Sequence, residues 1–199
     1  MNNGDARAEI LSSIRAHLKL SVPYDGGEPP AVATSRKAVS QPTAEPVVEL
    51  FKKNLEAVDG HCVIVDSEPE VEEAIKRIAR GKLAANSEEP PATRDLFEYE
   101  IGITLAQAGI AETGTLVLDS QVERNRLVSL VPPVHIAVLD AARIYRTLGE
   151  TLRVLQSGAE LSPAVTFITG PSRTGDIELT LTVGVHGPRE LHVIIVQNN

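Results

Sequence analysis

Two apolar runs in the second half of the chain, His135-Ile-Ala-Val-Leu-Asp140 and Ala164-Val-Thr-Phe-Ile-Thr169, have the length and composition of buried β-strands. Between them, apolar residues recur at three- and four-residue steps. This spacing predicts one helix over 141–156 with an inward face made of Ile144, Leu148, Leu152 and Leu155. A strand, a helix and a further strand in succession are typical of domains built around a parallel sheet.

The same alternation extends toward both ends of the chain. Helices are predicted over 47–58 and 68–80, and Gly60 ends the first of them. Residues 101–105 form either a short strand or a turn, and for 179–185 a helix starting after Asp176 is the alternative to a strand. The remaining predicted strands cover 61–66, 82–85, 115–118, 127–131 and 192–196. Because many of these strands are uniformly apolar, we predict an α/β fold, a three-layer α/β/α sandwich with a mostly parallel sheet.

The first 46 residues differ in composition from the rest. Residues 21–46 are rich in Pro, Gly, Ser and Ala and lack an apolar period, which predicts a flexible linker. The α/β domain is therefore expected to occupy 47–199. Residues 1–20 are predicted to form an amphipathic helix, which would pack on its own domain, on a second copy of the chain or on another protein through Ile10, Leu11, Ile14 and Leu18.

Charge and cysteine content argue against several classes of protein. The formal net charge is −8 and the pI is about 5.2, so long-range repulsion disfavours non-specific binding to nucleic acid or to an anionic membrane surface. The single cysteine, Cys62, cannot form an intrachain disulfide or ligate an iron–sulfur cluster by itself. No apolar run approaches the ~18 residues of a membrane span and the N-terminus lacks a signal-peptide core, so we expect a cytoplasmic protein.

Known cofactor fingerprints are also missing from the sequence. No glycine-rich dinucleotide or ATP motif occurs in a usable context. The five histidines include no pair at the i, i+4 spacing of a helical zinc site, so no metal site is expected.

The loop Gly170-Pro-Ser-Arg-Thr-Gly-Asp-Ile-Glu178 combines small, hydroxyl and charged residues directly after a predicted strand. In open parallel sheets, ligands bind outside the carboxyl ends of the strands. Glycines permit close approach to a ligand, and an arginine fork suits a carboxylate or phosphate. The loop is thus a candidate anion-binding turn, the alternative being a solvated turn, and its candidate site residues are Gly170, Ser172, Arg173, Thr174, Asp176 and Glu178.

A second polar turn and two basic residues could contribute to the same site. Glu112-Thr113-Gly114-Thr115 joins two apolar segments, and Glu112 there could act as a nucleophile or base, or simply belong to a surface turn. Arg126 and His135 are predicted near strand ends. His186, next to Gly187-Pro188, is the best isolated histidine for a ligand contact.

Three blocks, taken in order, resemble the lactate utilization protein C family. They are Gly109-Ile-Ala-Glu-Thr-Gly-Thr-Leu-Val-Leu118, Arg126-Leu-Val-Ser-Leu-Val-Pro-Pro-Val-His-Ile136 and Thr169-Gly-Pro-Ser-Arg-Thr-Gly-Asp-Ile-Glu178. The segment Gly184-Val-His-Gly-Pro188 fits as well, and the likeness covers about 47–197. The family usually has Ala at the place of Gly175 and often Asp at the place of Glu112.

The resemblance implies a LUD domain, with a fold related to the sugar-isomerase and CoA-transferase superfamily. It implies a role in bacterial oxidation of L-lactate to pyruvate, beside two partner proteins that carry the iron–sulfur clusters. It also implies that the matching residues form the site: Glu112, Thr113, Gly114, Arg126, His135, Ser172, Arg173, Thr174, Asp176, Glu178 and His186.

Three functional hypotheses follow. In the first, the chain is a subunit of a lactate-oxidising complex that binds a small carboxylate or another anion and binds no cofactor itself. In the second, it is a stand-alone transferase or isomerase in which Glu112 acts on a phosphorylated or thioester substrate. In the third, it is a scaffold that docks a partner through its N-terminal helix. The oligomeric state stays open, and a homo-oligomer is compatible with all three.

Overall fold

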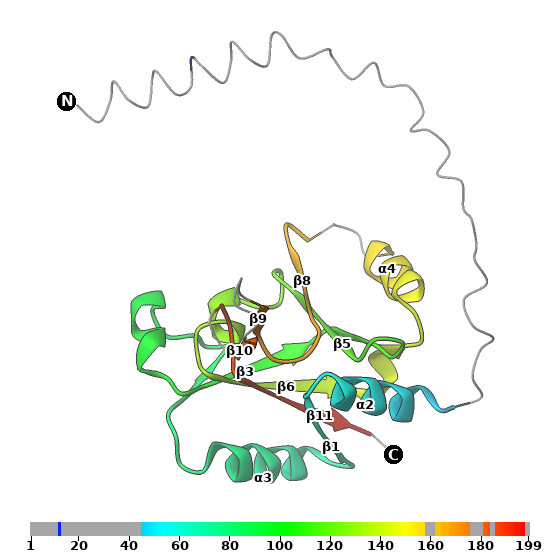
Figure 1. Ribbon diagram of the computed structural model, residues 1–199, viewed down its shortest axis with the longest axis horizontal. Helices are drawn as coiled ribbons and strands as arrows, with labels where there is room; N and C mark the ends of the chain where they lie inside the picture. Colours follow the sequence, from blue (N-terminus) through cyan, green and yellow to red (C-terminus); the bar gives the residue numbers. More distant parts are fainter. Residues whose placement is uncertain (1–11, 13–44, 158–161, 176–180, 184–185, 198–199) are drawn as a thin grey trace. The chain divides into compact units, whose positions relative to one another are not determined.

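The computed structural model describes residues 12, 45–157, 162–175, 181–183 and 186–197. The chain divides into the units Met1–Thr43 and Ala44–Asn199, and every element labelled in Figure 1 belongs to the second. Apart from residue 12, the predicted N-terminal helix over 1–20 lies outside the described residues, as does nearly all of the predicted linker.

A five-stranded parallel sheet forms the centre of the domain. Its strands lie in the order β1 (His61–Val65), β11 (Glu190–Val196), β6 (Val134–Asp140), β3 (Ile101–Ala106) and β2 (Ala84–Asn86). Every neighbouring pair is parallel, so the predicted α/β fold with a mostly parallel sheet is confirmed. The apolar run quoted first, which contains His135, is the middle strand β6. Such a strand is buried on both faces, which explains its nearly unbroken apolar sequence.

Helix α3 (Glu68–Ala79) covers one face of this sheet (Figure 1). Its inward residues Ala74 and Ala79 pack with Ile136 and Ile194 of the central strands. The helix begins where the Glu70 carboxylate accepts hydrogen bonds from the backbone N–H of Asp66 and from the Ser67 hydroxyl. Both donors lie at or before the N-cap residue Ser67, so this carboxylate fixes the turn that leads into the helix.

The opposite face of the parallel sheet is covered by α2 (Val47–Ala57) and by a second sheet. This sheet has the order β7 (Ile144–Tyr145), β4 (Ala108–Ile110), β5 (Thr115–Asp119) and β8 (Val165–Ile168). The pairs β4–β5 and β5–β8 are antiparallel, and β4–β7 is parallel. Helix α4 (Leu148–Gln156) packs on the outer side, where Leu155 meets Ile110 and Val117. The second sheet is a layer that the sequence did not predict.

One predicted strand, 127–131, is instead the 3₁₀ helix η2 (Arg126–Ser129). The Asn125 side chain accepts a hydrogen bond from the N–H of Leu127 at 3.0 Å, which favours a turn over an extended strand. Gly102 on β3 makes room for this turn, because a Cβ there would lie 1.8 Å from the Val128 carbonyl oxygen. Local side-chain hydrogen bonds thus override the apolar content of 127–131.

The predicted helix 141–156 is three elements: η3 (Ala141–Arg143), the strand β7 and α4. The Asp140 carboxylate caps η3 by accepting the N–H of Ala142, and Ile144 then pairs with Gly109 of β4. Only the last nine residues form an α-helix, and its inward face is shifted from the predicted one. Thr151 is buried, whereas Leu148 and Leu152 remain 43% and 39% exposed.

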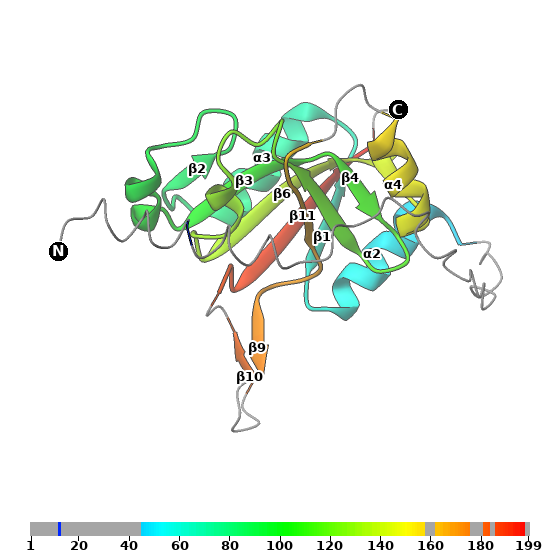
Figure 2. The same ribbon diagram turned by 90° about the horizontal axis from the view of Figure 1, so that it is seen from above.

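Two further strands, β9 (Arg173–Gly175) and β10 (Leu181–Val183), form a separate antiparallel pair that extends away from the two sheets in Figure 2. A short 3₁₀ helix, η1 (Thr93–Glu98), lies in the acidic stretch between β2 and β3. Within the described part of the chain, no helix combines the length and apolar character needed to cross a bilayer.

Candidate anion-binding site

The segment after β8 lines a cleft of about 480 Å³. We name it the Gly170 cleft. Besides Gly170–Arg173, its walls come from the end of α2, from η2, from β8 and from the segment before β11. The further lining residues are Val58, Ser129, Leu130, Thr166, Phe167, Ile168, Thr169, His186, Gly187 and Pro188. Four predicted site residues, Gly170, Ser172, Arg173 and His186, therefore meet in one place.

The prediction of an anion site assumed that the loop follows a strand of the parallel sheet. The structure places the loop elsewhere. Strand β8 belongs to the second sheet and runs antiparallel to β5, so the loop after it does not leave the carboxyl edge of a parallel sheet. Ser172 N–H donates to the Pro188 carbonyl at 2.8 Å, just before β11 begins. Arg189 N–H donates to the Pro133 carbonyl at 2.7 Å, just before β6 begins. The Gly170 cleft thus adjoins the amino ends of the central parallel strands.

Two glycines bring the site loops against the C-terminal half of α2. Gly170 has φ 77°, and a Cβ there would lie 2.6 Å from the Val58 carbonyl oxygen. Gly114 has φ 63°, and its Cβ would lie 2.2 Å from the Leu55 nitrogen. A side chain at either place would meet backbone atoms in a conformation that only glycine adopts freely. The glycines of two separate sequence blocks therefore serve one packing requirement.

Arg173 is held at the end of α2. Its Nη2 donates to the Val58 carbonyl at 3.2 Å and to the Asp59 carboxylate. A cation beside the last carbonyls of a helix is favoured by the helix dipole. The Arg173 side chain is 38% exposed, so this anchored guanidinium is still in contact with solvent. A ligand entering the Gly170 cleft would thus meet a positioned guanidinium that also pairs with Asp59.

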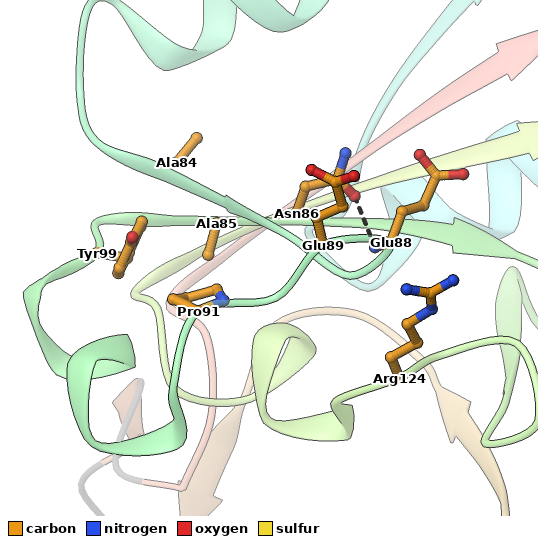
Figure 3. A pocket seen from close by; sticks show the side chains of 8 residues that line it. All are labelled: Ala84, Ala85, Asn86, Glu88, Glu89, Pro91, Tyr99 and Arg124. Atoms are coloured by element: carbon orange, nitrogen blue, oxygen red, sulfur yellow. Dashed lines mark hydrogen bonds between the residues drawn. The ribbon is translucent and has the colours of Figure 1, made fainter.

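The charge of the lining separates the Gly170 cleft from other hollows. Its described lining contains one arginine, one histidine and several hydroxyls, and no Asp or Glu. By contrast, the hollow beside β2 places Glu88 and Glu89 opposite Arg124 (Figure 3). In a chain of net charge −8, a cleft whose described lining has an arginine and no carboxylate is the more suitable place for an anion, although Arg173 also pairs with Asp59.

A chain of three hydroxyl groups leads into this cleft. Thr113 Oγ1 lies 2.7 Å from Thr115 Oγ1, which lies 2.6 Å from Thr169 Oγ1. Thr113 is on the exposed turn between β4 and β5, Thr115 is buried, and Thr169 lines the cleft. The predicted residue Thr113 is therefore connected to the Gly170 cleft through Thr115, whereas Gly114 packs against α2.

Glu112, the predicted nucleophile or base, has a structural contact. Its Oε1 accepts a hydrogen bond from the N–H of Leu148 at 2.7 Å, at the first residue of α4. Glu112 is not among the residues that line the Gly170 cleft. Its carboxylate satisfies a donor at a helix start, which is a common role for an acidic side chain.

Arg126 and His135 also stay outside the lining. Arg126 opens η2 and is exposed, and Ser129 and Leu130 from the same segment line the cleft instead. His135 is 1% exposed within β6, where Nε2 lies 2.8 Å from Thr104 Oγ1. Burial lowers the pKa of His135 to about 4, so the ring is neutral near pH 7 and offers no charge to an anion.

One buried ionisable residue, Glu123, is not among the predicted site residues. Glu123 is 3% exposed, and its Oε1 has no hydrogen-bond partner in the described structure. Burial raises the pKa of the carboxyl to about 7, against the opposing attraction of Arg126. Nothing in the local sequence distinguishes Glu123 from the exposed acidic residues around it.

The remaining predictions fall partly outside the described structure. Asp176 and Glu178 lie beyond the described residues, and Thr174 is described only as a backbone position of β9. In the segments that the structure covers, no group of three His, Cys, Asp or Glu residues could hold a metal ion. The one cysteine of the chain, Cys62, is partly buried, and burial raises its pKa to about 12, so it remains a thiol. An iron–sulfur cluster does not fit this donor set.

The fold agrees with that of a solved protein. The crystal structure of a duf162 family protein from Deinococcus radiodurans superimposes with a TM-score of 0.61, at 21% sequence identity. The match covers 75% of this chain and 96% of that chain. The α/β architecture with its central parallel sheet is thus a known one.

Sequence comparison identifies the family. The model of the LUD domain matches residues 83–196, more than half of the chain, and the chain belongs to the LUD domain family. A protein of Neisseria meningitidis is 38% identical over 60% of this chain and 56% of its own length. Lactate utilization protein C of Exiguobacterium is 36% identical over 57% and 51%, and that of Bacillus subtilis is 35% identical over 51% and 44%. The chain spans about half the length of these relatives.

Proposed function

We propose that this chain is a component of a bacterial lactate utilization system and that the Gly170 cleft binds lactate, pyruvate or a similar small carboxylate. The observation that carries the proposal is the anchored Arg173, in a cleft whose described lining contains no carboxylate. An arginine fork is well suited to a carboxylate. The relatives named Lactate utilization protein C supply the substrate class.

The reaction we propose for the whole system is the oxidation of L-lactate to pyruvate. This conversion removes two protons and two electrons from the carbinol group and leaves the carboxylate unchanged. A cleft that binds the unchanged carboxylate can therefore hold both substrate and product. The donor set of this chain does not fit an iron–sulfur cluster, so we assign the electron acceptor to partner proteins that carry such clusters.

Two other hypotheses receive less support. A stand-alone transferase or isomerase needs a reactive carboxylate, and the Glu112 carboxylate is hydrogen-bonded to the start of α4. A scaffold built on the N-terminal helix concerns residues beyond the described structure. Carboxylate binding in the Gly170 cleft is therefore the function that the geometry favours.

The test is calorimetric titration of the full chain with L-lactate and with pyruvate, comparing wild type with Arg173→Ala. We expect the substitution to weaken binding by about 10-fold or more, because it removes a charge-assisted hydrogen bond. Arg94→Ala is the matched control, since Arg94 is an exposed arginine paired only with its neighbour Asp95 in the described structure.

Two outcomes would contradict the proposal. Equal affinities of wild type and Arg173→Ala would show that Arg173 does not bind the ligand. Binding that is lost instead in Arg143→Ala would place the ligand in the cleft of about 690 Å³ at the carboxyl edge of the parallel sheet, which Arg143 lines.

A further inference from the structure

The hydroxyl chain Thr113, Thr115 and Thr169 is short, continuous and partly shielded from water. Its two O···O distances are 2.7 and 2.6 Å, and the middle residue, Thr115, is 5% exposed. Distances of this size are those of well-formed O–H···O hydrogen bonds. Each of the two links therefore uses one hydroxyl hydrogen.

Counting hydrogens fixes what the ends of the chain can do. Three hydroxyls carry three hydrogens, and the two links consume two of them. The third hydrogen is on Thr113, which is exposed, or on Thr169, which lines the Gly170 cleft, or on Thr115 if both ends donate to it. The last arrangement leaves the hydrogen of the buried Thr115 without an acceptor among the three hydroxyls. If Thr113 donates to Thr115 and Thr115 donates to Thr169, then the hydrogen of Thr169 is available to the cleft.

An anion in the cleft selects this second arrangement. A carboxylate oxygen accepts hydrogen bonds and cannot donate one, so it favours Thr169 as a donor. Hydrogen bonds in a chain polarise one another, and the two upstream hydroxyls thereby strengthen the donor at the end. The Thr113 hydroxyl stays fully hydrogen-bonded in this arrangement, because Thr113 is exposed and water can donate to its oxygen.

We propose that Thr169 is a ligand-binding residue of the Gly170 cleft and that Thr115 positions its hydroxyl hydrogen toward a bound anion. This inference rests on the proposed binding of a small anion in that cleft. Thr169, directly after β8, would supply a neutral hydrogen-bond donor to the ligand. Arg173, from the segment that follows, would supply the charge. The turn between β4 and β5 thus takes part in binding without touching the ligand.

The experiment is a calorimetric titration of the full chain with pyruvate, L-lactate and inorganic phosphate, for Thr169→Val and Thr169→Ser. Valine keeps the shape and removes the hydroxyl, so we expect about 10-fold weaker binding, while serine restores it. Thr115→Val is expected to weaken binding about 3-fold through the loss of polarisation, with recovery in Thr115→Ser. Thr93→Val, at an exposed threonine of η1, is the control.

The outcomes separate this inference from the proposed function. If pyruvate binding needs Arg173 but is unchanged in Thr169→Val, the inference is wrong and the proposed function stands. If pyruvate and lactate do not bind, but phosphate does and loses affinity in Thr169→Val, the inference stands and the proposed ligand is wrong. If Thr115→Ser fails to recover what Thr115→Val loses, the positioning role is refuted. If none of the three anions binds, both are wrong.

Discussion

At the scale of single residues, the most unusual side chain is Glu123, a carboxyl inside the domain without a partner for Oε1 in the described structure. Burial disfavours the charged form by more than the attraction of Arg126 favours it, which is why the pKa rises to about 7. The folded protein therefore keeps a proton on Glu123 at pH values where the unfolded chain has lost it.

This residue should make stability fall as pH rises. Between about pH 4.5 and 7 the folded state binds the Glu123 proton more tightly than the unfolded state, so the stabilising contribution present below pH 4.5 is lost by about pH 7. Glu123→Gln does not titrate. We predict that it equals wild type near pH 4.5 and exceeds its unfolding free energy by about 1–3 kcal/mol at pH 8, as measured by urea unfolding.

A control for this prediction is Glu73→Gln, which removes one negative charge from an exposed position of α3. If Glu123→Gln and wild type show the same difference in stability at both pH values, the carboxyl is not titrating inside the fold. Over the lower part of this range His135 acts in the opposite sense. Its lowered pKa means that the stability it contributes above pH 6.5 is lost as pH falls toward 4.

At the scale of elements, α4 depends on residues that precede it. The helix has nine residues and leaves Leu148 and Leu152 largely exposed, so packing stabilises it only modestly. Its first N–H groups are instead satisfied by Glu112, which accepts from Leu148, and by Thr147, which accepts from Glu150. Glu112 is therefore expected to matter for α4 rather than for chemistry.

We predict that Glu112→Ala lowers the unfolding free energy by about 0.5–2 kcal/mol and speeds hydrogen exchange at Leu148. Glu112→Gln keeps an acceptor oxygen and should lose less. Glu73→Ala again serves as the control at an exposed helical position. Should Glu112→Gln retain full stability and yet abolish lactate-dependent activity in the complete system, the carboxylate would have the chemical role that the stand-alone enzyme hypothesis requires.

The same elements explain which parts of the fold were predictable from sequence. Continuous apolar runs such as 135–140 marked the central strands, and the helix over 68–79 followed from its spacing. The predictions of a strand over 127–131 and of one helix over 141–156 were wrong, because Asn125 and Asp140 form local side-chain hydrogen bonds to the backbone. Such bonds compete with the element that hydrophobic spacing alone favours.

The candidate site could also be predicted only in part, because tertiary contacts decide which residues line it. Gly170, Ser172, Arg173 and His186 were identified by residue type, and they line one cleft. Thr169 and Ser129 were missed, because their role depends on tertiary neighbours rather than on local sequence. Placing β8 in the parallel sheet was also an error that sequence could not avoid, since strand direction is set by pairing with β5.

At the scale of the whole molecule, two candidate ligand sites lie at opposite edges of the parallel sheet. The larger is at the carboxyl edge, where open α/β sheets usually bind ligands, but its lining includes Glu68, Glu88 and Asp140 against Arg143 alone. The Gly170 cleft is at the amino edge, and no carboxylate is among its described lining residues. For an anionic ligand, charge outweighs the topological preference, because burying like charges together is costly.

The most direct test of this conclusion is amide NMR of the isotope-labelled full chain during a titration with pyruvate. Binding in the Gly170 cleft predicts the largest shift changes at Ser172, Arg173 and Gly187, with little change along Ile103–Ala106. Largest changes along Ile103–Ala106, at the carboxyl edge of the parallel sheet, would contradict the account.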